Sequence, residues 1–236
     1  MNNLRLIAMD MDGTLTQHKS PLDSECRSVL EKLREKYKLL MVCAGGCDRV
    51  YNQLEHFDID ISGFYGMQFG KVQDGVLTIR ESVIEKTDKD KVTACADQIR
   101  NEFGLHDYVG DAVEFHDSGL ITFPILGTKA KLDDKLAYDP DRAKRRAYYD
   151  RVCEIFADYN VFIGGTSSFD IAPKPYNKLY ALKKYLDENN IASDEVLFFG
   201  DDYGVGGNDN CVFESDIEFV KIDNYRDFPK YATELL

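Results

Sequence analysis

Three short apolar segments, each ending near a glycine or an aspartate, constrain the fold of this chain more than any other feature. They are residues 4–9, 39–43 and 196–199. Runs of this kind are typical of strands that are buried on both faces of a parallel sheet. Apolar residues at helical spacing accompany each run, from near Asp48, from Asn177 and from Ser20-Pro21, where Ser20 is expected to be the N-cap. The alternation of strand and helix predicts an α/β fold built on a doubly wound parallel sheet.

The middle of the chain has a different pattern. Helical periodicity over about 88–103 is followed by alternating runs, by a helix start at Asp139-Pro140 and by two further strand-like runs. Paired antiparallel strands with two helices on one face form a separate α+β unit. We therefore predict an inserted α+β domain with an antiparallel sheet over residues 83–174. Residues 1–82 and 175–236 form the two parts of the core domain.

Charge and composition exclude several classes of partner. The formal net charge is −13, and no basic block is longer than Lys144-Arg145-Arg146, so neither nucleic acid nor an anionic membrane is an expected partner. The longest apolar stretch, Leu39 to Ala44, is too short for a membrane span, and Asp10 interrupts any signal-peptide core. We expect a cytoplasmic protein. The six cysteines and four histidines lack the spacing of a zinc site or a disulfide framework.

Acidic residues follow the first and the last of the apolar runs. Asp10 and Asp12 are two positions apart, so their carboxylates leave an extended strand end on the same side, while Gly13 permits a tight turn. Gly200-Asp201-Asp202 follows the last run, and Gly206 to Asp209 closes its loop. Because ligands gather at the carboxyl ends of parallel strands, these carboxylates are predicted to share one small volume.

Clustered carboxylates repel one another and any anionic substrate unless a cation neutralises them. Oxygen ligands with few histidines favour Mg²⁺, so we expect Mg²⁺ as the cofactor. Its expected ligands are Asp10, Asp12, Asp201 and Asp209. Lys178 stands in the first turn of its helix, where a cation is unfavourable unless an anion lies nearby. The predicted phosphate-binding groups are Thr14, Gly45, Gly46, Lys178 and Asn208.

These groups suggest a phosphoryl-transfer mechanism. In this hypothesis Asp10 attacks phosphorus and forms an aspartyl-phosphate. Asp12 protonates the leaving oxygen and then deprotonates the attacking water. Two easier steps thus replace one difficult step.

The motifs resemble those of the haloacid dehalogenase superfamily, from Asp10 through Lys178 to Asp209. The resemblance implies a Rossmann-like core with an inserted cap domain. A narrower similarity is to eukaryotic-type phosphomannomutases. It is carried by five segments: Asp10–Thr16, Gly45–Asp48, Glu114–His116, Ser168–Asp170 and Phe199–Asp209. This resemblance implies that Asp10 is the nucleophile, that Asp12 is the acid and base, that Asp201 binds metal, and that Ser168 and Asp170 contact the sugar. It also suggests a homodimer through the cap.

The chain departs from those mutases where they bind a second anionic group. In place of cap arginines it has His116 and either Thr128 or Lys129, with a third position near Lys131–Lys135, and Lys19 replaces a core arginine. Lys19, His116 and Lys129 are nevertheless predicted to face substrate. Cys47 replaces the serine whose hydroxyl binds phosphate in the family.

Three functions stay open, and the first is preferred. It is a Mg²⁺-dependent phosphatase of small sugar phosphates or related phosphorylated metabolites, because loss of bidentate arginine contacts impairs a bisphosphate intermediate more than hydrolysis. The second is a hexose phosphomutase, with cap cations opposite Asp10. The third is a catalytically idle sugar-phosphate-binding protein. The complete set of Asp10, Asp12, Lys178 and Asp201 argues against the third.

Overall fold

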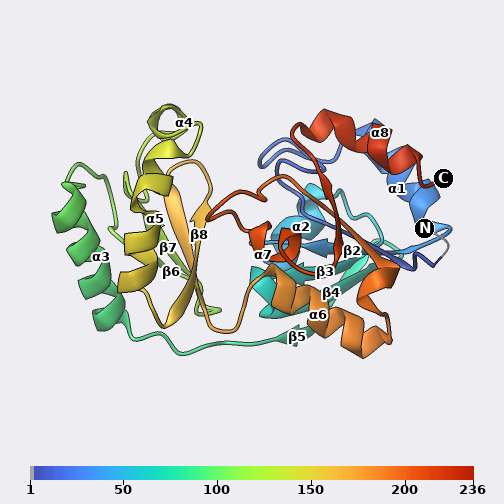
Figure 1. Ribbon diagram of the computed structural model, residues 1–236, viewed down its shortest axis with the longest axis horizontal. Coiled ribbons are helices and arrows are strands. Elements are labelled where there is room, and N and C mark those ends of the chain that lie inside the picture. The colour runs from blue at the N-terminus through green and yellow to red at the C-terminus, as the bar shows by residue number, and fades with distance from the viewer. Residues whose placement is uncertain (1–2) are drawn as a thin grey trace. The chain divides into compact units, whose positions relative to one another are not determined.

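The computed structural model describes residues 3–236 as two compact units, coloured by residue number in Figure 1. The core unit comprises residues up to Val83, Asn177–Gly204 and Asp209–Leu236. The cap unit comprises Ile84–Tyr176 together with the short segment Val205–Asn208. Each unit has its own sheet and its own apolar core.

The core unit contains a seven-stranded sheet with the order β11-β10-β1-β2-β3-β4-β5. The strands are β1 (Leu6–Met9), β2 (Lys38–Val42), β3 (Asp60–Gly63), β4 (Gln68–Gln73), β5 (Val76–Ser82), β10 (Val196–Gly200) and β11 (Glu218–Lys221). Neighbours from β11 to β3 pair in parallel, whereas β4 pairs antiparallel with β3 and with β5. The parallel part places the ends of β1 and β10 side by side.

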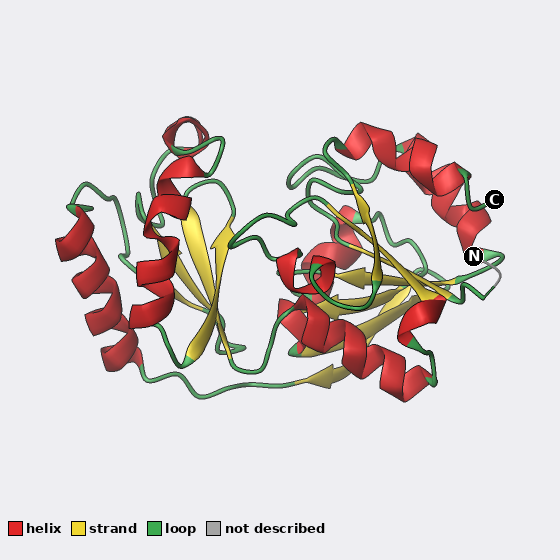
Figure 2. Ribbon diagram, viewed as in Figure 1, coloured by secondary structure: helices red, strands yellow, loops and turns green. Residues whose placement is uncertain are grey.

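Helices cover both faces of this sheet, as Figure 2 shows. They are α1 (Ser24–Arg34), α2 (Cys47–Gln53), α6 (Lys178–Asn189), α7 (Asn210–Phe213) and α8 (Phe228–Thr233). On β1, Ile7 and Met9 pack in the apolar cluster that includes α1, α2 and α8, whereas Leu6 and Ala8 pack in the cluster that includes α6 and α7. Alternate side chains of a strand point to opposite faces, so a doubly covered strand is apolar throughout. The predicted doubly wound α/β core is therefore confirmed.

The cap unit contains a four-stranded antiparallel sheet with the order β6-β7-β9-β8. Its strands are β6 (Glu114–Phe115), β7 (Ile121–Pro124), β8 (Tyr159–Gly164) and β9 (Ser168–Pro173), and its helices are α3 (Lys89–Phe103), α4 (Leu132–Tyr138) and α5 (Ala143–Ile155). Alternate residues of β7, β8 and β9 pack with α3 and α5 in one apolar cluster. The predicted α+β unit with an antiparallel sheet is confirmed.

Several elements differ from the sequence predictions. Helix α1 has Asp23 as its N-cap, with its carboxylate accepting the Cys26 amide at 2.8 Å, so the predicted cap at Ser20 is wrong. The α5 helix starts at Ala143 rather than directly after Asp139-Pro140. The Asp139 carboxylate still accepts the amides of Lys144 and Arg145. The β4–β5 hairpin and α4 are not among the predicted elements.

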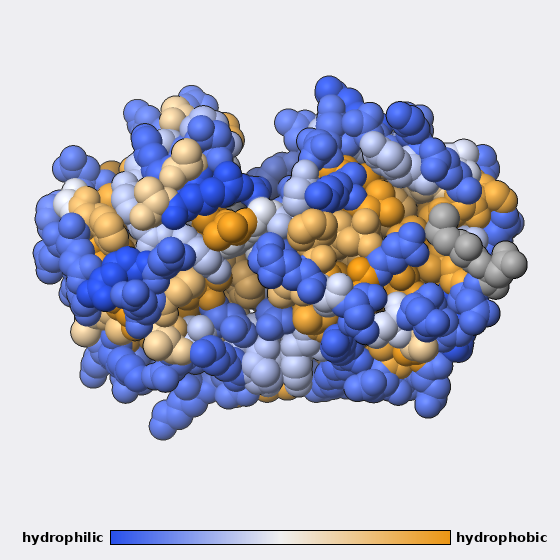
Figure 3. Space-filling model, viewed as in Figure 1, coloured by the Kyte–Doolittle hydropathy of each residue, from blue (hydrophilic) through white to orange (hydrophobic). Residues whose placement is uncertain are grey.

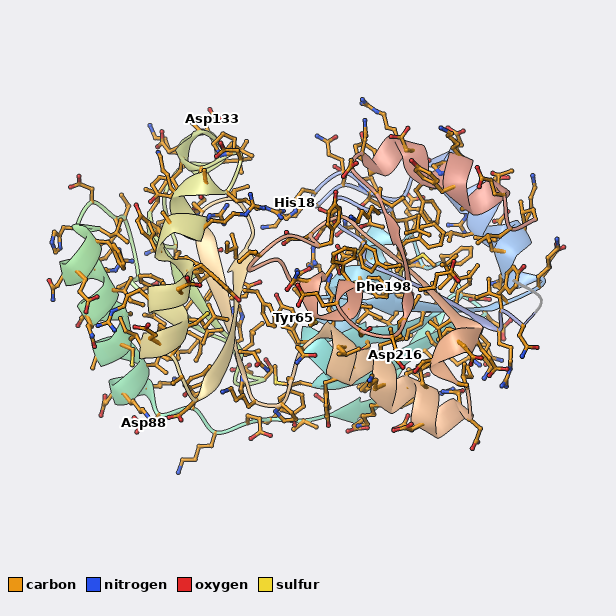
Figure 4. All side chains as sticks on the ribbon, in the orientation of Figure 1. His18, Tyr65, Asp88, Asp133, Phe198 and Asp216 are labelled. Atoms are coloured by element: carbon orange, nitrogen blue, oxygen red, sulfur yellow. The ribbon has the colours of Figure 1, made fainter. Side chains whose placement is uncertain are left out.

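The surface in the view of Figure 3 is mostly polar, with apolar side chains interspersed. Buried side chains such as Tyr65 and Phe198, labelled in Figure 4, belong to the interior of the core unit. Within residues 3–236, the helices are all too short or too polar to cross a membrane.

A buried ion pair holds the cap unit together. The Arg145 Nε lies 2.9 Å from Asp139 Oδ2, and both side chains are almost fully buried. The Arg145 Nη1 atom also donates to the carbonyls of Gly164 and Ser168, at 2.7 and 3.0 Å. The guanidinium thus joins the start of α5 to the turn between β8 and β9.

Replacing Arg145 with leucine should destabilise the protein strongly, because it leaves the Asp139 carboxylate buried without its cation. We expect a loss of about 3–5 kcal/mol in the free energy of unfolding. Urea titration of the whole chain, followed by circular dichroism, measures this loss. The neighbouring Arg146→Leu is the matched control, since Arg146 donates only an exposed hydrogen bond to a carbonyl. Equal stability of the two variants would contradict the assigned role.

Candidate active site

The candidate site is built at the carboxyl ends of β1 and β10. The Asp10 amide donates to the Phe199 carbonyl at 2.9 Å, so the strand pairing extends to the first carboxylate. Beyond it, Asp12 and Thr16 form an isolated bridge, and the Leu15 amide donates to the Met11 carbonyl at 2.9 Å. The loop after β1 is therefore fixed by its own backbone.

Lys178 links two of the carboxylates. It is the first residue of α6, and the N-cap Asn177 accepts the Tyr180 amide through its side chain. The fully buried Lys178 Nζ lies 2.7 Å from Asp10 Oδ1 and 2.8 Å from Asp209 Oδ1. Burial lowers the pKa of Lys178, but the two carboxylates overcome this effect and hold it above its ordinary value. The predicted cation at this helix start is thus stabilised by the anions around it.

Three carboxylates form a group with more negative charge than one lysine neutralises. Asp10, Asp201 and Asp209 each offer an oxygen atom, and these atoms lie within 4.8 Å of one another. Burial raises the pKa of Asp10 to about 6, although Lys178 opposes the rise. Burial and the charges of Asp10 and Asp209 raise the pKa of Asp201 to about 8. Closely spaced oxygen ligands with excess negative charge fit Mg²⁺.

Neighbouring groups fix the positions of these carboxylates. The Asp209 Oδ2 atom accepts the Asp202 amide at 3.1 Å, and the Thr14 hydroxyl donates to Asp201 Oδ1 at 3.0 Å. In the structure the Thr14 hydroxyl therefore binds a carboxylate oxygen. Its contact with phosphate stays a prediction. Gly13, at a φ of +100°, brings its backbone against Asp201: a Cβ atom there would lie 2.5 Å from Asp201 Oδ2.

The Asp12 side chain makes a different set of contacts. Its Oδ2 lies 2.8 Å from Arg49 Nη1, and its Oδ1 accepts from Gln53 Nε2 at 2.8 Å and from the Lys19 amide at 2.7 Å. Burial raises the pKa of Asp12, but Arg49 and these hydrogen bonds together hold it below its ordinary value. The Asp12 carboxylate is not part of the group formed by Asp10, Asp201 and Asp209 among residues 3–236. Its predicted role as a metal ligand stays untested.

Arg49 and Gln53 are the site residues that the sequence analysis missed. They lie one turn apart on α2, directly after Gly45-Gly46. This i, i+4 spacing next to a predicted phosphate loop is the signal that could have identified them. Lys19 is the predicted substrate contact that belongs to the core unit. The Lys19 amide donates to the Asp12 carboxylate, and the Lys19 side chain is exposed.

The predicted phosphate loop, Gly45-Gly46, is held through its carbonyl groups. The Gly45 carbonyl accepts the Phe64 amide at 3.1 Å, and the preceding Cys43 carbonyl accepts the Tyr65 amide at 3.1 Å. Phe64 and Tyr65 both have positive φ, an unfavourable conformation for large side chains. The hydrogen bonds that hold the loop therefore come from two residues in a strained backbone conformation.

Cys47 cannot replace the hydroxyl expected at its position. Its thiol is completely buried and faces the Ile61 carbonyl at 3.8 Å, and burial raises its pKa to about 12. Its amide donates to Gln68 Oε1 at 2.8 Å. The loop thus directs this side chain toward β3.

The other predicted substrate residues belong to the cap unit. His116 Nε2 lies 3.0 Å from the Thr122 hydroxyl, and Ser168 Oγ donates to the Gly164 carbonyl at 3.0 Å. Thr122 pairs with Asp170 across β7 and β9. Lys129 is exposed, and its amide donates to the Val109 carbonyl. Asn208 is grouped with the cap unit, so it is not placed beside Lys178 here.

Comparison with known proteins identifies the family. A model described as eukaryotic phosphomannomutase matches residues 26–230 of the chain. The chain belongs to the eukaryotic phosphomannomutase family. Among its relatives, the phosphomannomutase of Triticum aestivum is 31% identical over 227 residues, which cover 89% of this chain and 86% of that protein. The phosphomannomutase of Saccharomyces cerevisiae is 29% identical over 223 residues, covering 88% and 84%.

Solved structures share the fold of this chain. The N-terminally truncated IMP-nucleotidase of Plasmodium falciparum superposes with a TM-score of 0.69 at 17% identity, covering 100% of this chain and 71% of that one. A haloacid dehalogenase-like hydrolase from Bacteroides thetaiotaomicron gives a TM-score of 0.59 at 14% identity, covering 99% and 100%. The predicted similarity to the haloacid dehalogenase superfamily and to phosphomannomutases is confirmed.

The acidic group of this phosphomannomutase family member should bind Mg²⁺ more tightly as pH rises from 6 to 8. Asp10 and Asp201 have raised pKa values of about 6 and about 8, so both hold protons at low pH that a bound cation must displace. Isothermal titration calorimetry in buffers of different ionisation enthalpy measures the released protons. Asp201→Asn should release fewer protons and bind more weakly. Affinity and proton release that do not change with pH would contradict the assignment.

Gly13→Ala should displace the Asp201 carboxylate and weaken Mg²⁺ binding. The added Cβ collides with Asp201 and also occupies a backbone conformation that costs about 1–3 kcal/mol for most residues. Gly75→Ala is the matched control, because Gly75 also has positive φ but open space at its Cβ position. Both variants should lose stability in thermal unfolding, and only Gly13→Ala should lose Mg²⁺ affinity. Unchanged affinity in Gly13→Ala would show that the close approach is unimportant.

Proposed function

We propose that this chain is a Mg²⁺-dependent phosphatase acting on small sugar phosphates or related phosphorylated metabolites. The single observation that carries the hydrolase proposal is the composition of the cap sheet. The face opposite α3 and α5 carries Glu114, His116, Thr122, Ser168 and Asp170. In the strands described as β6 to β9, no lysine or arginine is present.

This face suits hydroxyl groups better than a second phosphate. Carboxylate, hydroxyl and imidazole groups accept or donate single hydrogen bonds to a sugar. Two carboxylates, on Glu114 and Asp170, repel an anion, whereas recognition of phosphate favours the planar fork of arginine. Thr128 is one of the two residues, with Lys129, that stand where the eukaryotic-type phosphomannomutases have a cap arginine. Its hydroxyl donates to Asp111 Oδ2 at 3.2 Å, and the Lys135 ammonium donates to its carbonyl at 3.0 Å. A mono-phosphorylated substrate fits these groups.

The proposed reaction has two steps at Asp10. One carboxylate oxygen of Asp10 forms a bond to phosphorus while the bond from phosphorus to the sugar oxygen breaks, and the protonated form of Asp12, which the second step regenerates, gives that oxygen its proton. A water oxygen then attacks phosphorus, the bond to Asp10 breaks, and Asp12 accepts the water's proton. Inorganic phosphate and the free sugar leave. Lys178, 2.7 Å from Asp10, orients the nucleophile.

The metal supplies charge neutralisation for the phosphoryl oxygens when it is bound. Asp10, Asp201 and Asp209 are the residues that would hold it, because their oxygen atoms lie within 4.8 Å of one another. Thr14 and the Asp202 amide orient two of these carboxylates.

A hexose phosphomutase is the second candidate, and family membership favours it. The relatives in wheat and yeast are named phosphomannomutases. In that case the cap cations that bind the second phosphate would come from Lys129, Lys131 and Lys135. A catalytically idle binding protein is disfavoured, because a binder does not need the complete set of Asp10, Asp12, Lys178 and Asp201. Cytoplasmic location and a homodimer through the cap stay predictions.

The test incubates the protein with Mg²⁺ and a panel of hexose 1- and 6-phosphates, with and without a hexose bisphosphate primer. Release of phosphate without isomer interconversion supports the phosphatase, and primed interconversion with little release supports the mutase. Asp10→Asn should reduce either activity by at least about 10³-fold, because it removes the nucleophile. Turnover by Asp10→Asn at the wild-type rate, or activity that survives strong chelation, would overturn the proposed mechanism.

A further inference from the structure

Two side chains of α2 enclose the Asp12 carboxylate. We propose that Arg49, together with Gln53, is a positioning residue that holds Asp12 in the orientation from which it exchanges a proton with the substrate's leaving oxygen. This inference rests on the proposed phosphoryl-transfer function. It applies equally to a phosphatase and to a mutase, because both begin with loss of a leaving oxygen from phosphorus.

The contacts form a closed ring of three side chains. Arg49 Nη1 lies 2.8 Å from Asp12 Oδ2, and Gln53 Nε2 donates to Asp12 Oδ1 at 2.8 Å. Arg49 Nη1 also donates to Gln53 Oε1 at 3.2 Å, which joins the two partners to each other. Because both carboxylate oxygens are held from α2, rotation of the Asp12 carboxyl group is restricted.

The ring is anchored to the backbone on both sides. Gln53 Nε2 donates to the Thr16 hydroxyl at 3.0 Å, and the Gln53 carbonyl accepts the Leu22 amide at 2.9 Å. The Lys19 amide donates to Asp12 Oδ1 at 2.7 Å, and Lys19 has a φ of +57°. The loop between β1 and α1 therefore cannot shift relative to α2 without breaking several hydrogen bonds.

The Arg49 guanidinium lies against the backbone of Gly45. A Cβ atom at Gly45 would lie 2.2 Å from Arg49 Nε and 2.5 Å from Arg49 Nη2. The Arg49 side chain therefore covers the backbone of the phosphate loop while it pairs with Asp12. One side chain thus contacts both the loop and the carboxylate.

Stability alone does not account for this arrangement. The Arg49 side chain is 38% exposed, so solvent weakens the contribution to folding of its pair with Asp12, which is 14% exposed. The same unit has comparable exposed pairs, such as Arg34 with Asp58 at 3.2 Å, that lie outside the candidate site. The Arg49 pair differs from these other pairs because its partner, Asp12, is the proposed general acid.

The role of the acid depends on the leaving group, and this dependence tests the proposal. A hexose oxygen leaves only with a proton, whereas p-nitrophenolate leaves without one. The ratio kcat/KM reports the steps up to the first loss of the leaving group, so a misplaced acid lowers it for the hexose phosphate alone. We expect Arg49→Met to lower kcat/KM for a hexose 6-phosphate at least about tenfold, a part of the roughly 10²–10⁴-fold that general-acid catalysis contributes, and to lower it much less for p-nitrophenyl phosphate.

Three further variants test the proposal by the same two kcat/KM ratios. Gln53→Leu should show the same selective loss. Arg49→Lys should restore part of the hexose phosphate activity, because one donor to Asp12 remains. Arg34→Met is the matched control, since it removes an arginine from an exposed pair in the same unit, and it should leave both ratios unchanged. An equal loss for both substrates in Arg49→Met would overturn the proposal and indicate that Arg49 binds the phosphoryl group itself.

A crystal structure of Arg49→Met provides a readout that does not depend on activity. We expect the Asp12 carboxyl group to rotate away from its wild-type position or to occupy several positions. If the wild-type protein hydrolyses and isomerises no phosphate ester, the proposed function fails, and this structure still decides the positioning claim. An Asp12 carboxyl group that does not move in the variant would overturn that claim.

Discussion

The contact between the Lys178 ammonium and the carboxylates of Asp10 and Asp209 is the interaction on which the rest of the site depends. A buried lysine next to a helix start is unfavourable by itself, because both desolvation and the helix dipole oppose its charge. Two carboxylates within 2.8 Å compensate for this cost. The same contact joins β1, α6 and the loop after β10. The site therefore depends on the order of the strands in the sheet. A fold that did not place β1 beside β10 would leave three buried charges unpaired.

The sequence alone predicts the features of the molecule that follow from the order of the strands. Asp10, Asp201 and Asp209 come together because their strands are parallel neighbours, and apolar runs bounded by glycine and aspartate indicate such strands. Lys178 was predicted from its place beside an anion-binding helix start. The cap sheet also followed from its alternating pattern.

Other features depend on contacts that residue spacing does not encode. The pairing of Arg49 with Asp12 requires a particular face of α2 to lie toward the loop after β1. A helix as short as α2 contains too few residues for its apolar spacing to predict which face that is. The β4–β5 hairpin was missed because β5 is mostly exposed and mixes polar with apolar residues. The N-cap of α1 was misplaced because Ser20-Pro21 and Asp23 offer similar local chemistry, and only the Asp23 carboxylate reaches the Cys26 amide. These differences arise where tertiary contacts select among local alternatives.

The orientation of Cys47 has a consequence for the chemistry that the loop can tolerate. Oxidants and alkylating agents react with accessible thiolates, and a buried thiol that keeps its proton offers neither access nor the reactive anion. Cys47 therefore directly follows the predicted phosphate loop, Gly45-Gly46, without making that loop sensitive to oxidants. At the position where the resemblance predicts a serine hydroxyl, this chain has a buried thiol that packs in the apolar core.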